Sequence, residues 1–417
     1  MHEVNVGRRS LADYRSLVPK DLMAEIDALS ERLRGRQVLH VNATAFGGGV
    51  AEILYTLVPL VSDVGLEAHW QILSAPPEFF TITKSFHNGL QGQSVDFPDE
   101  SRALYEDVCR SNAAEFTRPY DFIVIHDPQP LAIRDFVVQS EDQTTWWIWR
   151  CHIDTSTPDE SLYDYLLTSI NRYDAAVYTL ADYVPEGLTV PVREIAPTID
   201  PLAPKNMKLS PEDSRYIVRQ FGIDVDRPLL LQVSRFDPWK DPLGVVDVYR
   251  AVKAKDPDVQ LALIGSMASD DPEGWDYLER VIAYVGGDPD VFILSNLDNV
   301  GSVEINAFQS HADVIMQKST REGFGLTVSE GLWKGRPVIG GAVGGIPLQI
   351  DDGVTGYLVH SAAECAERCL EVLADPERHH LMALQGKEKV RHDFLTPRLL
   401  RDDLRLFADL EEGSIEA

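Results

Sequence analysis

The sequence contains few cysteines and no long apolar run. Only four of its 417 residues are cysteines, and the spacing of Cys365 and Cys369 does not match that of common zinc sites. We therefore expect all four to be reduced, structural thiols. No apolar run approaches the roughly 18 residues of a membrane helix, and the first residues lack the apolar core of a signal peptide. These absences predict a cytoplasmic protein.

Basic residues are scarce relative to acidic ones. The chain has 38 Lys and Arg against 66 Asp and Glu, which gives a formal net charge of −28. Binding to nucleic acid or to an anionic membrane requires a basic surface, so we expect neither partner. Any phosphate-binding site must be locally basic against this acidic background.

Short apolar runs alternate with amphipathic helical stretches along the whole chain, which predicts an α/β fold with parallel sheets and helices on both faces. A chain of this length is expected to form at least two domains. A proline-rich stretch at residues 195–211 separates residues 1–200 from residues 201–395. A charged amphipathic helix is predicted over residues 396–412, within the terminal segment 396–417, and packing back on the first domain is one option for it. The predicted strands are residues 37–42, 121–126, 146–149, 175–178, 228–234, 259–265, 291–294, 312–316 and 336–340.

The most informative segment is residues 321–330, with the sequence REGFGLTVSE. It places Glu322 and Glu330 around a glycine-rich turn and the start of a predicted helix. Backbone N–H groups at such a turn, together with the helix dipole, bind anions, so we predict a site for the phosphates of a nucleotide-activated substrate. The alternative is that Thr327 and Glu330 form a capping box that only stabilises the helix. Glu322 and the two glycines around Phe324 favour the binding interpretation, because a plain cap needs none of them.

Two further candidates follow predicted strands. Arg235 and Lys240 come after the strand at residues 228–234, where two cations can bind a diphosphate, although such cations are more often solvated surface residues. Three glycines at residues 47–49 lie between a strand and a helix. They match neither a Walker loop nor a G-x-G-x-x-G fingerprint, so a tight turn and a binding loop are equally supported.

Polar residues that could contact a sugar occur in the first half of the chain. His152 lies two residues before Asp154 and directly after an aromatic strand, a position that suits contact with a sugar. The alternative is a structural role, which is more common for a lone histidine. Lys84 and Asn88 belong to a polar segment at residues 83–92 that we interpret as a loop. Its donors and acceptors suit a sugar site, but composition alone indicates an ordinary surface loop.

At this point the chain resembles a known family. Residues 322–330, with the sequence EGFGLTVSE, resemble the signature of glycosyltransferase family 4, whose members are retaining, metal-independent enzymes of the GT-B fold, with two Rossmann-like domains facing each other across a cleft. The order and spacing of the other candidates extend the resemblance over nearly the whole chain. Residues 40–52, 84–92, 149–154 and 317–325 are similar to a narrower group, the trehalose glycosyltransferring synthases.

The resemblance implies a role for each candidate. Arg235 and Lys240 would neutralise the leaving diphosphate, Glu322 would hold hydroxyls of the transferred glucose, Glu330 would hold the ribose and His152 would contact the donor sugar. The other residues that the resemblance assigns to donor binding are Gly48, Gly49, Asn296, Leu297, Phe324, Gly325, Leu326 and Thr327. Those that it places weakly at the acceptor are Lys84, Asn88 and Asp154.

The implied function is retaining synthesis of trehalose from NDP-glucose and glucose, reversible and with release of NDP. No cofactor and no metal are expected, because no acidic D-x-D motif follows a suitable strand. The expected partners are these small molecules, and a homodimer is one option. The sequence does not choose among ADP-, UDP- and GDP-glucose. The alternatives are a retaining trehalose phosphorylase, a family 4 transferase with another acceptor and a non-catalytic sugar-nucleotide sensor.

Overall fold

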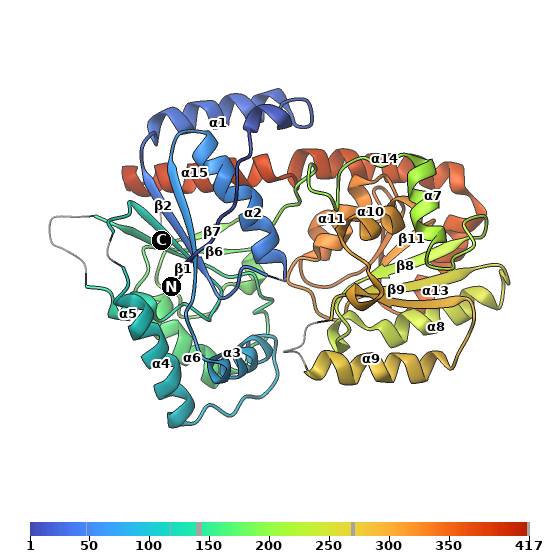
Figure 1. The fold of residues 1–417 in the computed structure, drawn as a ribbon, viewed down its shortest axis with the longest axis horizontal. Coiled ribbons are helices and arrows are strands. Elements are labelled where there is room, and N and C mark those ends of the chain that lie inside the picture. The colour runs from blue at the N-terminus through green and yellow to red at the C-terminus, as the bar shows by residue number, and fades with distance from the viewer. Residues whose placement is uncertain (47, 117, 139–143, 268–271, 415–417) are drawn as a thin grey trace. The chain divides into compact units, whose positions relative to one another are not determined.

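The structure is a computed structural model that describes residues 1–417 apart from 47, 117, 139–143, 268–271 and 415–417. The chain divides into two compact units (Figure 1). The first unit comprises Met1–Thr198 and Leu395–Ala417, and the second comprises Ile199–Phe394. The division lies two residues before the predicted boundary, and the C-terminal helix belongs to the first unit.

The first unit contains a seven-stranded sheet in the order β1-β3-β2-β4-β5-β6-β7. All neighbouring strands are parallel except β1, which pairs antiparallel with β3. The strand order reverses between β2 and β4, which makes the carboxyl ends of these two strands a topological switch point. The strands are β1 (His2–Glu3), β2 (Gln37–Asn42), β3 (Glu67–Ile72), β4 (Phe122–His126), β5 (Trp146–Arg150), β6 (Ala175–Tyr178) and β7 (Val192–Glu194).

The helices of the first unit cover the sheet and bury its central strands. These strands are therefore continuous apolar runs and do not alternate between apolar and polar residues. The helices are α1 (Lys20–Arg32), α2 (Gly48–Asp63), α3 (Pro77–Leu90), α4 (Asp99–Ala113), α5 (Ile133–Phe136), α6 (Glu160–Ile170) and α15 (Thr396–Glu412), with short 3₁₀ helices η1 (Leu11–Tyr14) and η2 (Ala181–Tyr183).

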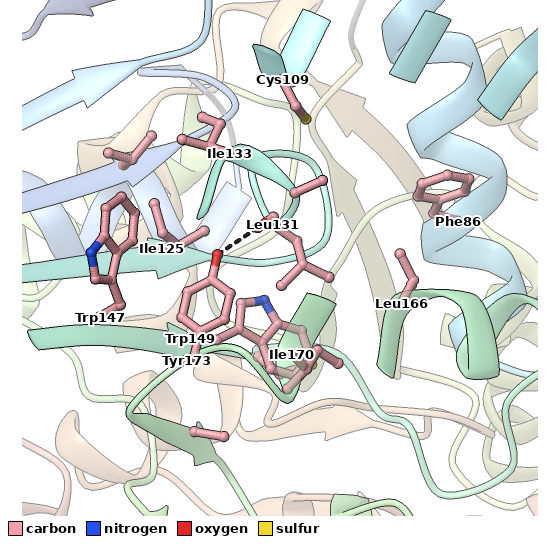
Figure 2. Packing of buried hydrophobic residues seen from close by; sticks show 14 of the residues in the cluster. Phe86, Cys109, Ile125, Leu131, Ile133, Trp147, Trp149, Leu166, Ile170 and Tyr173 are labelled. Carbon is pink, nitrogen blue, oxygen red and sulfur yellow. Dashed lines mark hydrogen bonds between the residues drawn. The ribbon is translucent and has the colours of Figure 1, made fainter. Parts of the chain in front are cut away.

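Aromatic and aliphatic side chains pack together in one core of this unit (Figure 2). Trp147 and Trp149 project from β5 into a cluster with Phe86 of α3 and Tyr173. The Tyr173 hydroxyl donates to the carbonyl of Leu131 at 2.5 Å. A buried hydroxyl of this kind needs a partner, because an unmet polar group costs about 1–3 kcal/mol.

The second unit contains a six-stranded parallel sheet in the order β10-β9-β8-β11-β12-β13. Here the order reverses between β8 and β11. In Figure 1, α8, α9 and α13 lie on one side of this sheet, and α7, α10 and α11 lie on the other. The strands are β8 (Leu229–Val233), β9 (Gln260–Gly265), β10 (Val291–Ser295), β11 (Val314–Gln317), β12 (Val338–Gly341) and β13 (Tyr357–Val359). The helices are α7 (Pro211–Arg219), η3 (Pro238–Lys240), α8 (Pro242–Lys253), α9 (Pro272–Val285), η4 (Asn296–Asp298), α10 (Ser302–His311), α11 (Leu326–Trp333), α12 (Ile346–Gln349), α13 (Ala362–Ala374) and α14 (Pro376–Asp393).

The predicted α/β architecture is confirmed, and each predicted strand lies within two residues of an observed one. One local prediction is wrong. The segment at residues 83–92, interpreted as a loop, is mostly the last two turns of α3. Phe79, Thr83, Phe86 and Leu90 recur on one face of that helix and are buried, while the polar residues between them face outward.

The four cysteines are free and buried, as predicted. Among the described residues, none of the helices combines the length and the apolar character needed to cross a membrane.

The C-terminal helix α15 packs against α1 and α2 within the first unit (Figure 1). A buried ion pair joins this helix to the sheet, with Nη1 of Arg150 at the end of β5 lying 3.1 Å from Oδ1 of Asp403. The two side chains are only 3% and 6% exposed. Burial raises the pKa of Asp403 to about 6, although Arg150 acts in the opposite direction. Phe407 of the same helix stacks on Phe122 of β4, with ring centroids 4.4 Å apart.

We expect Asp403→Ala to lower the free energy of unfolding by about 3 kcal/mol, because Arg150 would stay buried without its counterion. Asp409→Ala on the same helix is the matched control. It removes the partner of Arg193, in a pair whose side chains are 35% and 27% exposed, and should cost no more than about 1 kcal/mol. Denaturant unfolding followed by tryptophan fluorescence measures both. Equal losses in the two variants would contradict a special role for the buried pair.

Candidate functional site

The polar residues of the second unit gather at the point where its strand order reverses. β8 ends at Val233 and is followed by Arg235 and Lys240, and β11 ends at Gln317 and is followed by the turn that contains Glu322. In parallel sheets, ligands bind beyond the carboxyl ends of strands at such a point. The fold therefore brings together segments about 80 residues apart.

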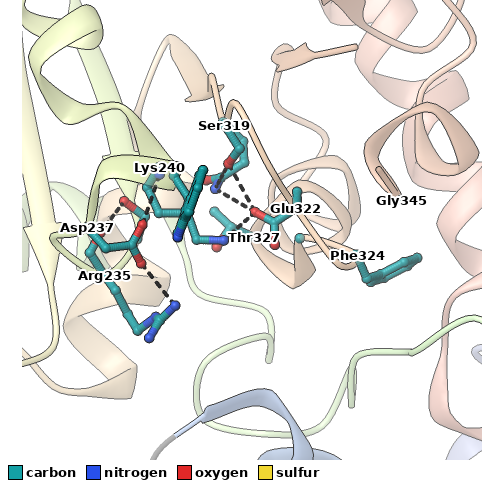
Figure 3. A network of polar contacts seen from close by, with 12 residues as sticks. Arg235, Asp237, Lys240, Ser319, Glu322, Phe324, Thr327 and Gly345 are labelled. Atoms are coloured by element: carbon teal, nitrogen blue, oxygen red, sulfur yellow. Dashed lines mark hydrogen bonds and ion pairs between the residues drawn. The ribbon is translucent and has the colours of Figure 1, made fainter. Parts of the chain in front are cut away.

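Glu322 is the centre of a polar network (Figure 3). Its Oε2 accepts from Nζ of Lys240 at 2.6 Å, from Oγ of Ser319 at 3.0 Å and from Nε2 of Gln317 at 3.2 Å. The residue is only 7% exposed. Lys240 is thus not a solvated surface cation, because its ammonium group is the counterion of a buried carboxylate.

Arg235 is in a different situation. Its side chain is 46% exposed and forms an ion pair with Asp237, from Nη2 to Oδ2, at 2.9 Å (Figure 3). Asp237 also accepts from the backbone N–H of Lys240 at 3.0 Å and so caps η3. A half-exposed guanidinium at the end of β8 can still donate to an incoming anion.

The turn before α11 depends on glycine. Gly325 has φ of 84°, in the left-handed region, and a Cβ there would lie 3.1 Å from Cγ of Glu322. The backbone N–H groups of Gly325, Leu326 and Thr327 precede the first N–H that closes a turn of α11, which belongs to Val328. The start of this helix therefore offers donors to an anion.

The alternative of a capping box is wrong. The N-cap of α11 is Gly325, and Thr327 lies inside the helix, where its hydroxyl donates to the carbonyl of Val233 at 3.1 Å. That contact joins the start of α11 to the end of β8. Glu330 has other partners.

Glu330 is fully buried, which differs from the expectation of a carboxylate open to a ribose. Its Oε1 lies 2.7 Å from Nζ of Lys205, and its Oε2 accepts from Nε2 of Gln309 at 2.8 Å. Although burial acts to raise it, Lys205 and Lys334 hold the pKa of Glu330 below its ordinary value. Because the carboxylate is fully buried, a ribose can reach it only if the residues that cover it move. No sequence signal pointed to Lys205 or Gln309.

The remaining donor-side candidates differ in exposure. Phe324 is 4% exposed and its ring packs against Phe394, pointing away from Glu322 in Figure 3. The carboxamide of Asn296 is bonded at both ends to the backbone of Met267, at 2.7 and 3.1 Å. Leu297 is 61% exposed. Asn296 is also exposed, so the side chains of Asn296 and Leu297 reach the surface and only that of Phe324 is buried.

The corresponding edge of the first unit carries the other candidates. Gly48 begins α2 with φ of 76°, and Gly49 lies in the first turn of that helix, whereas Gly47 lies outside the described residues. His152 follows β5, and its backbone N–H donates to Oδ1 of Asp127 at 2.8 Å. Asp127 follows β4 and has φ of 62°. The ring of His152 lies 3.0 Å from that of His126, between Nε2 and Nδ1.

The acceptor-side candidates are divided between helix α3 and the turn after β5. Lys84 and Asn88 are one helical turn apart on α3 and are partly exposed. Asp154 is only 4% exposed, and its Oδ1 accepts from the N–H and the hydroxyl of Ser156 at 3.0 and 2.6 Å. Its carboxylate therefore stabilises its own turn, and the predicted contact with an acceptor stays a prediction. Within the described parts of the chain, no group of three or more His, Cys, Asp or Glu side chains could hold a metal ion.

Two family models match the chain. Residues 40–185 match the family model described as "Trehalose synthase, N-terminal domain", and residues 213–389 match "Glycosyl transferases group 1". The chain is 57% identical over 414 residues to the trehalose synthase of Rubrobacter xylanophilus, covering 98% of this chain and 99% of that protein. It is 46% identical over 396 residues to that of Pyrococcus horikoshii, covering 94% of each. Among solved structures, sucrose-phosphate synthase from Thermosynechococcus elongatus is similar with a TM-score of 0.70 at 17% identity, over 91% of this chain and 100% of that one.

Asp127 gives a pH-dependent prediction for the first unit. Burial raises its pKa to about 7, although the His152 N–H and Arg150 act to lower it. The folded protein then keeps a proton that the unfolded chain releases near about pH 4, so ionisation of Asp127 destabilises the fold as the pH rises from there through about 7. Asp127→Asn keeps an acceptor, tolerates the positive φ and cannot ionise.

We therefore expect the stability of Asp127→Asn relative to wild type to increase between about pH 4 and about pH 8, by on the order of 2 kcal/mol. Denaturant unfolding at several pH values measures this difference. Asp164→Asn, at an exposed position of α6, is the matched control for the same chemical change. A pH-independent difference at Asp127 would contradict the raised pKa.

Proposed function

The chain belongs to the trehalose synthase family of GT-B glycosyltransferases, and from that premise we propose that it forms trehalose by transferring a glucosyl group from NDP-glucose to free glucose. The transfer proceeds with retention of the anomeric configuration and releases NDP. The observation that carries this proposal is the arrangement of Lys240, Glu322 and the Gly325 turn at the switch point of the second sheet.

The leaving diphosphate gains negative charge as the glycosidic bond breaks, and stabilising that charge is the largest electrostatic contribution we expect. Two kinds of donor are available for it in the second unit. Arg235 is half exposed at the end of β8, and the N–H groups of Leu326 and Thr327 lie at the positive end of α11. Because protein cations and amides perform this task, we propose that the reaction needs no metal ion.

The buried carboxylate of Glu322 is suited to hold a sugar hydroxyl. It already accepts three hydrogen bonds at Oε2, so its position is fixed before a substrate arrives. A paired-carboxylate scheme of the glycosidase kind is not required for retention in this family. We assign Glu322 to binding the transferred glucose, with the leaving phosphate taking the proton of the acceptor hydroxyl.

Incubation with glucose and each of ADP-, UDP- and GDP-glucose tests the reaction. We expect α,α-linked trehalose and the matching NDP, identified by NMR, and the same rate in excess chelator. A parallel reaction with glucose 1-phosphate in place of the nucleotide sugar distinguishes the phosphorylase. Trehalose formed only in that reaction would overturn the proposal, and loss of activity in chelator would overturn metal independence.

Substitution of Arg235 tests the charge-stabilising role. We expect Arg235→Gln to lower kcat by about a hundredfold, because the lost interaction strengthens as the diphosphate departs. Arg219→Gln, at an exposed position of α7, is the control for removing one positive charge and should keep the wild-type rate. Steady-state kinetics with saturating glucose measures both. Similar rates in the two variants would exclude a direct role for Arg235.

Substitution of Glu322 tests whether it is a nucleophile. We expect Glu322→Gln to lower kcat and wild-type protein to accumulate no glycosyl-enzyme during turnover, as monitored by intact-protein mass spectrometry. A glucosyl adduct on Glu322 would replace the proposed mechanism by a double displacement.

A further inference from the structure

Three histidines of the first unit form one hydrogen-bonded chain at the edge where β2, β4 and β5 end. Nδ1 of His40 lies 3.1 Å from Nε2 of His126, and Nδ1 of His126 lies 3.0 Å from Nε2 of His152. Successive ring centroids are 5.3 Å apart, and the planes of the second pair of rings are inclined by only 14°. His40 and His126 are 0% and 1% exposed, and His152 is partly exposed at the end of the chain of rings.

The register of the strands explains this arrangement. His40 on β2 lies on the same face of the sheet as Val124 and His126 on β4, and His126 is the register partner of Arg150 on β5. The side chains of His40, His126 and Arg150 therefore project from one face of the sheet. His152 lies just beyond the end of β5 and continues the chain of histidine rings. Of the three histidines, only His152 was a candidate in the sequence. His126 is 26 residues from His152 and 86 residues from His40, so the three become neighbours only in the folded sheet.

Burial and a nearby cation keep the three rings neutral. Burial, followed by the charge of Arg150, lowers the pKa of His40 to about 3. The pKa of His126 lies well below its ordinary value because of burial, the two neighbouring histidines and Arg150, and that of His152 because of burial and Arg150. The acidic groups of this region are Asp403, which is the ion-pair partner of Arg150, and Asp127, whose pKa burial raises to about 7; the pKa of each histidine is lowered in their presence.

A chain of neutral imidazoles has only two arrangements of protons. Each neutral ring carries one N–H, and each N···N hydrogen bond needs one donor and one acceptor. If Nδ1 carries the proton in one ring, it must carry it in all three, and the same holds for Nε2. The tautomer of His152 is therefore coupled to those of His126 and His40.

The buried end of the chain of rings distinguishes the two arrangements. Nε2 of His40 is buried and has no hydrogen-bond partner among the described residues. A proton there would leave a buried N–H without an acceptor, which is rare in folded proteins, whereas an unmet lone pair is tolerated more often. The arrangement with the proton on Nδ1 avoids the orphaned N–H.

We propose that His40 and His126 are positioning residues that hold His152 as the neutral tautomer protonated on Nδ1, so that His152 presents an N–H donor to its ligand. A ring held in this way donates to a sugar oxygen and does not act as a base. Only this consequence for substrate rests on the proposed function. The tautomer is a property of the free protein.

The first test is ¹⁵N NMR of the free protein labelled on histidine, in which protonated and unprotonated ring nitrogens have separate chemical shifts. We expect His40, His126 and His152 to be neutral at neutral pH, each with the proton on Nδ1. Mixed tautomers, protons on Nε2 or an imidazolium at any of the three would overturn the proposal. This result does not depend on which sugar the protein uses. A failure of the tautomer proposal can therefore be distinguished from a failure of the proposed trehalose synthesis.

The second test uses two variants of His126. His126→Leu removes both hydrogen bonds, so we expect the signal of His152 to move to the Nε2-protonated form and kcat to fall about tenfold with little change in KM for glucose. His126→Asn keeps an N–H donor near the position of Nδ1 and should restore most of both properties. His379→Leu is the matched control, since His379 is 1% exposed and bonded to Tyr357 in the second unit. Wild-type kcat and an unchanged His152 signal in His126→Leu would overturn the positioning role.

Discussion

The contact between Lys240 and Glu322 is the interaction on which the site of the second unit depends. It joins the segment after β8 to the segment after β11 across the point where the strand order reverses, with 2.6 Å between Nζ and Oε2. Ser319 and Gln317 complete the environment of the carboxylate, and Gly325 is confined to glycine because Glu322 lies so close to it. The turn at Gly325, the start of α11 and the ammonium group of Lys240 are therefore structurally linked through Glu322. In the proposed reaction, a diphosphate that attracts Lys240 would also change the hydrogen bonding of Glu322, so the proposed sites of the leaving group and of the transferred sugar share one ion pair.

Much of the fold could be predicted from the sequence because buried parallel strands are continuous apolar runs, such as those of β8 and β9, with a distinct signal. The prediction failed where that signal is weak. β3 has only one buried residue in its six, and β7 and β13 have three residues each, too few for a pattern. The polar end of α3 was interpreted as a loop because its outward residues are hydrophilic, although the buried residues of that helix keep helical spacing.

The site, like the fold, could be predicted only where the local sequence carries a distinct signal. Glycines, cations and carboxylates that follow strands are visible in the sequence, and the residues around Glu322 do converge. The partners that bury Glu330 could not be found in this way, because Lys205 and Gln309 lie far from it in the chain and belong to no motif. Proximity created by tertiary packing decides whether a carboxylate faces a ligand or another side chain. A motif alone therefore identifies a residue of interest without fixing what that residue contacts.

The same principle explains why the chain returns to its first unit. Arg150 projects from the face of the sheet that carries His40 and His126, and it needs a counterion because its side chain is only 3% exposed. Asp403 on α15 supplies that counterion from the far end of the sequence. Burial, and to a smaller extent the positive charge of Arg150, lowers the pKa of each of the three histidines, so the arginine contributes to keeping them neutral. The terminal helix is thus part of the electrostatic environment of His152 as well as a cover for the sheet.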